Sequence, residues 1–136
     1  MGKQRIALVE DDEVLSKVIS EELNDAGFDV EQAFDGQAGL ELVQSKKPDL
    51  VLLDLLMPKM HGFEVLDQIK KKPETKTIPV IIMTMLGQDE DIKKGLKLGA
   101  SDYIVKSQHA VGEIIEKVKD FFGLEQHPGG EEKSEQ

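Results

Sequence analysis

The chain contains no cysteine and no tryptophan, and it has only five phenylalanines and one tyrosine among its 136 residues. Without cysteine, neither a disulfide framework nor a thiolate metal site can form. So few aromatic rings provide no stacking platform for nucleic-acid bases. The sequence also lacks the run of about 20 apolar residues that a membrane span needs, and its first residues lack the apolar stretch of a signal peptide. We therefore expect a soluble, cytoplasmic protein with no membrane insertion.

Basic residues are outnumbered by acidic ones, 17 to 27, which gives a net charge of −10. This excess repels phosphate backbones, so we expect no direct binding of nucleic acid. A chain of 136 residues is long enough for one domain whose hydrophobic core needs no disulfide or structural metal.

Short apolar runs alternate with amphipathic stretches five times along the chain. This alternation is typical of a parallel sheet covered by helices on both faces. The runs 5–10, 50–54 and 78–84 are nearly continuous in Ile, Leu and Val, which predicts strands buried on both faces. The runs 28–34 and 101–106 contain more polar residues, so we expect them at the sheet edges.

The stretches between these runs place apolar residues three and four apart, as helices do. The predicted helices are 13–26, 36–46, 62–72, 88–98 and 109–122. After residue 122 the periodicity stops, and four acidic residues accompany a single basic one. We therefore predict one domain over 1–122 and an acidic, disordered tail over 123–136.

Polar side chains lie where the predicted strands end, which is where an open parallel sheet binds its ligands. They are Glu10, Asp11, Asp12, Asp54, Thr84 and Lys106. Carboxylates gathered at one edge repel one another unless a cation lies between them, and Mg²⁺ suits such ligands. A carboxylate beside the metal can attack phosphorus and become an aspartyl phosphate. Lys106 and Thr84 could then neutralise and hydrogen-bond the phosphoryl oxygens.

Each of these residues also has a purely structural explanation. Asp11 or Asp12 could cap the helix that begins at residue 13. Thr84 is an ordinary strand residue, and Lys106 could be a solvated strand end. Asp54 is harder to explain in this way, because leucines flank it on both sides. The combination favours a phosphotransfer site.

Four segments together resemble the receiver domain of bacterial two-component response regulators. They are VEDDE, DLLMPKMHGFEVL, PVIIMT and GASDYIVK, and the resemblance extends from about residue 4 to residue 122. It implies an α/β, flavodoxin-like, doubly wound five-stranded parallel sheet of order 2-1-3-4-5 with five helices.

The resemblance also implies roles for individual residues. Asp54 would be the phosphoacceptor and would share a Mg²⁺ ion with Asp12 as a direct ligand, Asp11 through water, and the backbone carbonyl of Leu56.

Further roles concern the response to phosphorylation. Thr84 is similar to the switch hydroxyl that binds the phosphoryl group, and Lys106 to the lysine that pairs with it. Tyr103 matches the aromatic residue that turns inward, although a half-buried edge-strand tyrosine would look the same in sequence. In this family the change repacks the face of the fourth helix, fifth strand and fifth helix, where partners bind.

Two residues depart from the family pattern. Ser107 replaces the usual proline after the lysine, so we expect a trans peptide bond there. Met85 replaces a small residue beside Thr84 and could narrow access to the phosphoryl group, which predicts slower phosphoryl gain or loss. The apolar Leu56 and Leu86 leave no side chain to order an attacking water, which points to a longer-lived phosphoryl state.

The resulting hypothesis is a response regulator, not a conventional enzyme, that takes a phosphoryl group from a histidine kinase or phosphotransfer protein and then changes its affinity for an unknown protein. The alternative is a receiver-like binding module that acts without phosphorylation. A dehalogenase-type phosphatase would need an acid where Leu56 stands. A flavodoxin would need a phosphate-binding loop where this chain has EDDE.

Overall fold

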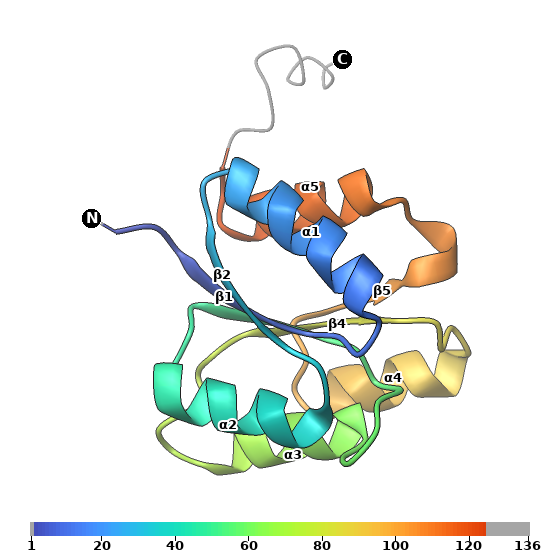
Figure 1. Ribbon diagram of the computed structural model, residues 1–136. Coiled ribbons are helices and arrows are strands. Elements are labelled where there is room, and N and C mark those ends of the chain that lie inside the picture. Colours follow the sequence, from blue (N-terminus) through green and yellow to red (C-terminus); the bar gives the residue numbers. More distant parts are fainter. Residues whose placement is uncertain (1, 125–136) are drawn as a thin grey trace.

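The computed structural model describes residues 2–124 (Figure 1). Its elements are β1 Arg5–Val9, α1 Glu13–Asp25, β2 Asp29–Ala33, α2 Gly36–Lys46, β3 Leu50–Leu53, α3 Gly62–Lys71, β4 Val80–Thr84, α4 Asp89–Lys97, β5 Asp102–Val105, a short 3₁₀ helix Lys106–Gln108, and α5 Val111–Phe121. The predicted tail over 123–136 lies outside the described residues from 125 onward.

The five strands are all parallel and lie in the order β2-β1-β3-β4-β5. This is the predicted order, with β2 and β5 at the edges as their more polar sequences indicate. Every residue of β3 and β4 is buried, as expected for central strands of a sheet covered on both faces.

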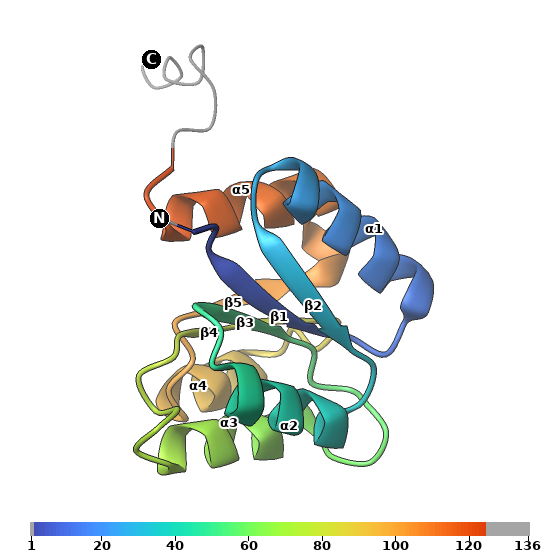
Figure 2. The same ribbon diagram turned by 60° about the vertical axis from the view of Figure 1, so that its left-hand side comes forward.

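Two helical layers cover the sheet, as Figures 1 and 2 show. Helices α1 and α5 lie on one face, and α2, α3 and α4 lie on the other. Successive strand side chains point to opposite faces, so Leu8 and Leu52 join the core under α1 and α5, while Val9 and Leu53 join the core under the other three helices. No helix among residues 2–124 is long and apolar enough to cross a bilayer.

The strands differ from the predicted runs mainly at their ends. Pro79 has no backbone N–H to contribute to the ladder, and β4 begins only at Val80. Glu10 and Asp54 follow β1 and β3 directly instead of ending them. The 3₁₀ helix after β5 was not predicted, whereas the trans peptide bond at Ser107 is confirmed, since residues 2–124 contain no cis bond.

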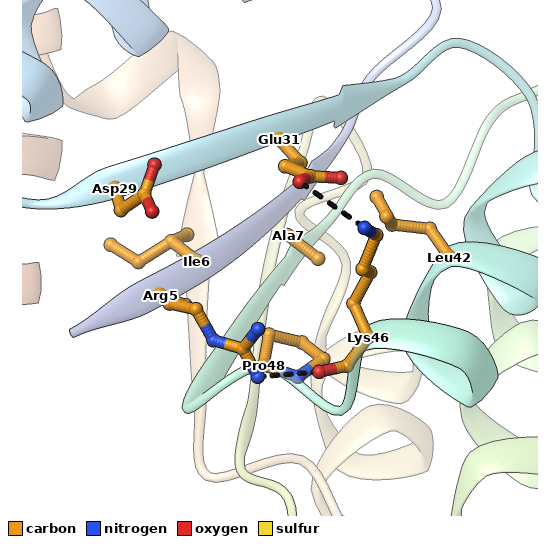
Figure 3. Close-up of a pocket in the computed structure, with 8 residues that line it drawn as sticks. All are labelled: Arg5, Ile6, Ala7, Asp29, Glu31, Leu42, Lys46 and Pro48. Atoms are coloured by element: carbon orange, nitrogen blue, oxygen red, sulfur yellow. Dashed lines mark hydrogen bonds and ion pairs between the residues drawn. The ribbon is translucent and has the colours of Figure 1, made fainter. Parts of the chain in front are cut away.

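At the amino ends of the strands, hydrogen bonds of Arg5 connect β1 to the end of α2. One guanidinium nitrogen donates to the carbonyls of Lys46 at 2.5 Å and Lys47 at 3.1 Å, and the Arg5 backbone N–H donates to the Asp49 carboxylate at 2.7 Å. Figure 3 shows the Arg5 guanidinium at the Lys46 carbonyl and the Lys46 ammonium facing Glu31; the latter two groups are 4.0 Å apart. The small pocket between these side chains lies away from the carboxyl ends of the strands.

Candidate functional site

The carboxyl ends of four strands bring together the side chains that the sequence places there. Glu10 follows β1, Asp54 follows β3, Thr84 ends β4 and Lys106 follows β5. The backbone N–H of Asp54 still donates to the Val9 carbonyl of β1 at 2.9 Å, which sets the two acidic segments side by side. Glu10 is 1% exposed and Asp54 is 4% exposed, so both carboxylates need compensating partners.

Asp54 has a partner for each carboxylate oxygen. One oxygen accepts the backbone N–H of Leu55 at 2.7 Å and, more weakly, that of Leu56 at 3.4 Å. The other lies 3.4 Å from the ammonium nitrogen of Lys106. Asp54 is therefore held in one orientation, with one oxygen fixed by the backbone and the other facing a cation.

Glu10 and Lys106 form a closer pair, at 2.5 Å, and the second Glu10 oxygen accepts the backbone N–H of Asp12 at 3.0 Å. Burial raises the pKa of Glu10, although the hydrogen bonds from Lys106 and Asp12 oppose that shift. Burial alone would lower the pKa of Lys106, but the hydrogen bond to Glu10 and the charge of Asp54 outweigh it and raise that pKa. Lys106 therefore stays protonated between the two carboxylates.

Three carboxylates at this edge lie close enough to share a cation. One ligand oxygen from each of Glu10, Asp11 and Asp54 lies within 4.8 Å of the others. Glu10 and Asp54 are buried, whereas Asp11 is exposed and leaves one side of the cluster open to water. Carboxylates with one open side fit Mg²⁺, which keeps several waters among its ligands.

Asp12 was expected as a direct metal ligand. Among residues 2–124, the cluster comprises Glu10, Asp11 and Asp54 and does not include Asp12. Its side chain accepts the backbone N–H of Leu15 at 3.1 Å and caps α1. The structure thus shows the helix-capping alternative for Asp12 and brings Glu10 into the cluster instead. The signal was available in the sequence: the acid immediately before the first helical residue is the capping residue, so the two preceding acids lie at the strand end.

The loop after Asp54 closes tightly before α3. The backbone N–H of Gly62 donates to the Leu55 carbonyl at 2.8 Å. A Cβ at Gly62 would come within 2.4 Å of the Asp54 carbonyl oxygen, so only glycine fits. Leu56, whose carbonyl was expected to be a metal ligand, is one of the residues of this loop.

The start of α2 holds the same loop from its other side. The backbone N–H of Gly36 donates to the Pro58 carbonyl at 3.3 Å, and a Cβ at Gly36 would lie 2.0 Å from the Met60 carbonyl oxygen. Asp35 caps α2 and also pairs with Lys59 at 3.7 Å. The loop after Asp54 is therefore packed directly against the turn between β2 and α2.

Thr84 and Tyr103 both contact the segment after β4. The Tyr103 hydroxyl donates to the Leu86 carbonyl at 2.7 Å, and the Leu86 N–H lies 3.5 Å from the Thr84 hydroxyl oxygen. Burial, followed by the charges of Asp91 and Asp54, raises the pKa of Tyr103 to about 12. Tyr103 is partly buried and packs against the core formed with α2, α3 and α4.

The family model of the response regulator receiver domain matches residues 6–119. The chain belongs to this family. Among its relatives, the DNA-binding dual master transcriptional regulator RpaA of Synechocystis sp. is 40% identical over 115 residues, covering 85% of this chain and 47% of RpaA. The phosphate regulon transcriptional regulatory protein PhoB of Rhizobium meliloti is 35% identical over 115 residues, covering 85% of this chain and 50% of PhoB. The receiver thus spans about half the length of the curated relatives it matches.

Solved receiver structures have the same fold. The Mn(2+)-bound form of the response regulator Rcp1 superposes with a TM-score of 0.79 and is 30% identical, covering 91% of this chain and 96% of Rcp1. Receiver domains bind Mg²⁺ at an acidic pocket, and the cluster of Glu10, Asp11 and Asp54 supplies such a pocket here.

Proposed function

We propose that this receiver is activated by phosphorylation of Asp54, in a Mg²⁺-dependent transfer from a histidine kinase or phosphotransfer protein of a two-component phosphorelay. The observation that carries the proposal is the environment of Asp54, whose carboxylate is oriented by the Leu55 N–H and faces Lys106 beside two further acids. A purely structural carboxylate would not need this many charged neighbours.

In the transfer, the Asp54 oxygen that faces Lys106 forms a bond to phosphorus while the bond from phosphorus to the donor histidine nitrogen breaks. The imidazole leaves with the electron pair of that bond. Lys106 and Thr84 bind the phosphoryl oxygens, and Asp54 is held in line by the backbone. When bound, Mg²⁺ neutralises the oxygens of the transferring group.

For the metal ligands we propose Asp11, Asp54 and the Leu56 carbonyl, with Glu10 in place of Asp12. The support is that Glu10 lies in the acidic cluster while Asp12 is committed to capping α1. The exposed Asp11 is the residue of this set that a solvated cation reaches first.

The response to phosphorylation would pass through Thr84 and Tyr103 to the face of α4, β5 and α5, where an unidentified downstream protein binds. Large apolar side chains are exposed on these helices, including Leu96 and Phe121. We propose no direct contact between this receiver and nucleic acid, since its net charge is −10.

Intact-mass measurement after incubation with acetyl phosphate and Mg²⁺ tests the acceptor. We expect one added phosphoryl group on the wild type and on the control Asp67→Asn, which changes a partly exposed acid of α3. Asp54→Asn should gain none. No gain on any of the three proteins, with Mg²⁺ binding confirmed, would instead support a receiver-like binding module that acts without phosphorylation.

A further inference from the structure

Gly95 is a buried residue of α4, at a site where a side chain would be expected. Glycine destabilises a helix interior relative to alanine, so a buried helical glycine usually has a packing reason. Here the reason is the close approach of α4 to β4 and β5.

A Cβ at Gly95 would meet two side chains of the sheet. It would lie 2.6 Å from the terminal methyl of Ile82, and 3.1 and 3.2 Å from two carbon atoms of the Tyr103 ring. The Ile82 methyl can rotate away, since it is the end of a flexible side chain. The Tyr103 ring has less freedom, because its hydroxyl donates to the Leu86 carbonyl and the residue packs, partly buried, against the core.

Tyr103 is in turn connected to the segment that carries Thr84. Leu86, which accepts the Tyr103 hydroxyl, is two residues beyond Thr84 and directs its own N–H toward the Thr84 oxygen. Any displacement of the ring away from α4 therefore changes a contact of the segment beside the phosphorylation site.

We propose that Gly95 is the positioning residue for Tyr103: because it has no Cβ, the ring lies inward beneath α4 with its hydroxyl on the Leu86 carbonyl. Gly95 sets the inward position before any phosphoryl group is present. Its effect on signalling rests on the proposed phosphorylation of Asp54, whereas the packing itself does not.

The composition of the chain makes this measurable, because Tyr103 is the single tyrosine and there is no tryptophan. Ultraviolet absorbance of the tyrosinate and tyrosine fluorescence at neutral pH both report this one ring. In the wild type we expect titration with a pKa of about 12, and in Gly95→Ala a pKa moved toward the ordinary 10.0, with altered fluorescence.

Gly112→Ala is the matched control. Gly112 is also a helical glycine, in α5, but a Cβ there meets nothing within 4 Å, so the Tyr103 signals should not change. Circular dichroism at each pH establishes that the titration is that of the folded protein.

The double variant Ile82→Val, Gly95→Ala removes the nearest methyl and also provides a folded test protein if Gly95→Ala alone is unstable. If the Tyr103 pKa is also shifted in this double variant, the result supports direct contact between residue 95 and the ring. An unchanged titration in Gly95→Ala, or a shift that disappears in the double variant, would overturn the proposal. All measurements use the unphosphorylated protein, so their failure is separate from a failure of Asp54 to accept phosphate.

Discussion

Tyr103 differs from an ordinary surface tyrosine because folding favours its neutral phenol. Its pKa is raised from 10.0 to about 12, first by burial and then by the charges of Asp91 and Asp54. A group whose pKa is higher in the folded state than in the unfolded state stabilises the fold fully below the unfolded pKa, and this contribution is lost as pH rises through the folded pKa.

The free energy of unfolding should therefore fall more steeply between pH 10 and pH 12 in the wild type than in Tyr103→Phe, which cannot ionise. Urea denaturation across this range measures the difference. Lysine titration contributes to both proteins and cancels in the comparison. Parallel pH profiles would show that the phenol is not buried as described.

Met85 follows Thr84 directly, and its side chain is 57% exposed. We expect Met85→Ala to widen access to Asp54 and to accelerate phosphoryl gain or loss by up to about tenfold, which corresponds to about 1.4 kcal/mol of barrier height. The rate of phosphoryl gain is measured with acetyl phosphate, and the rate of phosphoryl loss is measured after the phosphodonor is removed. Leu124→Ala changes an exposed apolar residue beyond the end of α5 and should leave both rates unchanged. Equal rates in wild type and Met85→Ala would exclude this role for Met85.

The site residues that could be predicted were those fixed by strand ends. Asp54, Thr84 and Lys106 lie together because parallel strands end at one edge of the sheet, which the hydrophobic pattern reveals. Of the three consecutive acids after β1, Asp12 was expected on the metal, whereas in the structure it caps α1 and Glu10 lies in the acidic cluster. Consecutive acids look alike in sequence, and only the boundary between strand and helix cap separates them.

At the scale of elements, the loop after Asp54 is held by a contact with the start of α2. We expect Gly36→Ala to weaken Mg²⁺ binding by about tenfold, since its Cβ would overlap the Met60 carbonyl oxygen and the backbone of the loop would have to move. Isothermal titration calorimetry measures the affinity. Gly112→Ala is again the control, because its Cβ meets no neighbour. An unchanged affinity in a folded Gly36→Ala protein would show that the loop is positioned without this contact.

Most elements could be predicted within a few residues because the apolar runs and amphipathic stretches alternate so regularly. The contact between Gly36 and Met60 could not, since it joins the start of α2 to a loop distant in sequence, and only the tertiary structure sets their separation. The 3₁₀ helix after Lys106 was missed for a related reason: three residues are too few to show a periodicity.

For the whole molecule, a cation that binds only the folded state raises its stability. Mg²⁺ present at 100 times its dissociation constant should raise the free energy of unfolding by about 2.7 kcal/mol. We expect this increase in the wild type and in Asp12→Asn, because asparagine also caps helices. Asp11→Asn should lose most of it. Thermal melts with and without Mg²⁺ measure this stabilisation in each variant. If Asp12→Asn shows no increase, Asp12 is a metal ligand after all.

The hydrogen bonds of Arg5 have a mechanical consequence for the whole molecule. Its backbone and guanidinium tie β1 to the end of α2 and to Asp49, just before β3, so three segments are joined at the end of the sheet opposite Asp54. The segments around Asp54 are loops and helix starts, whose backbone is easier to displace. We therefore expect a chemical change near Asp54 to displace the loops there before it tilts the strands that Arg5 joins at the other end.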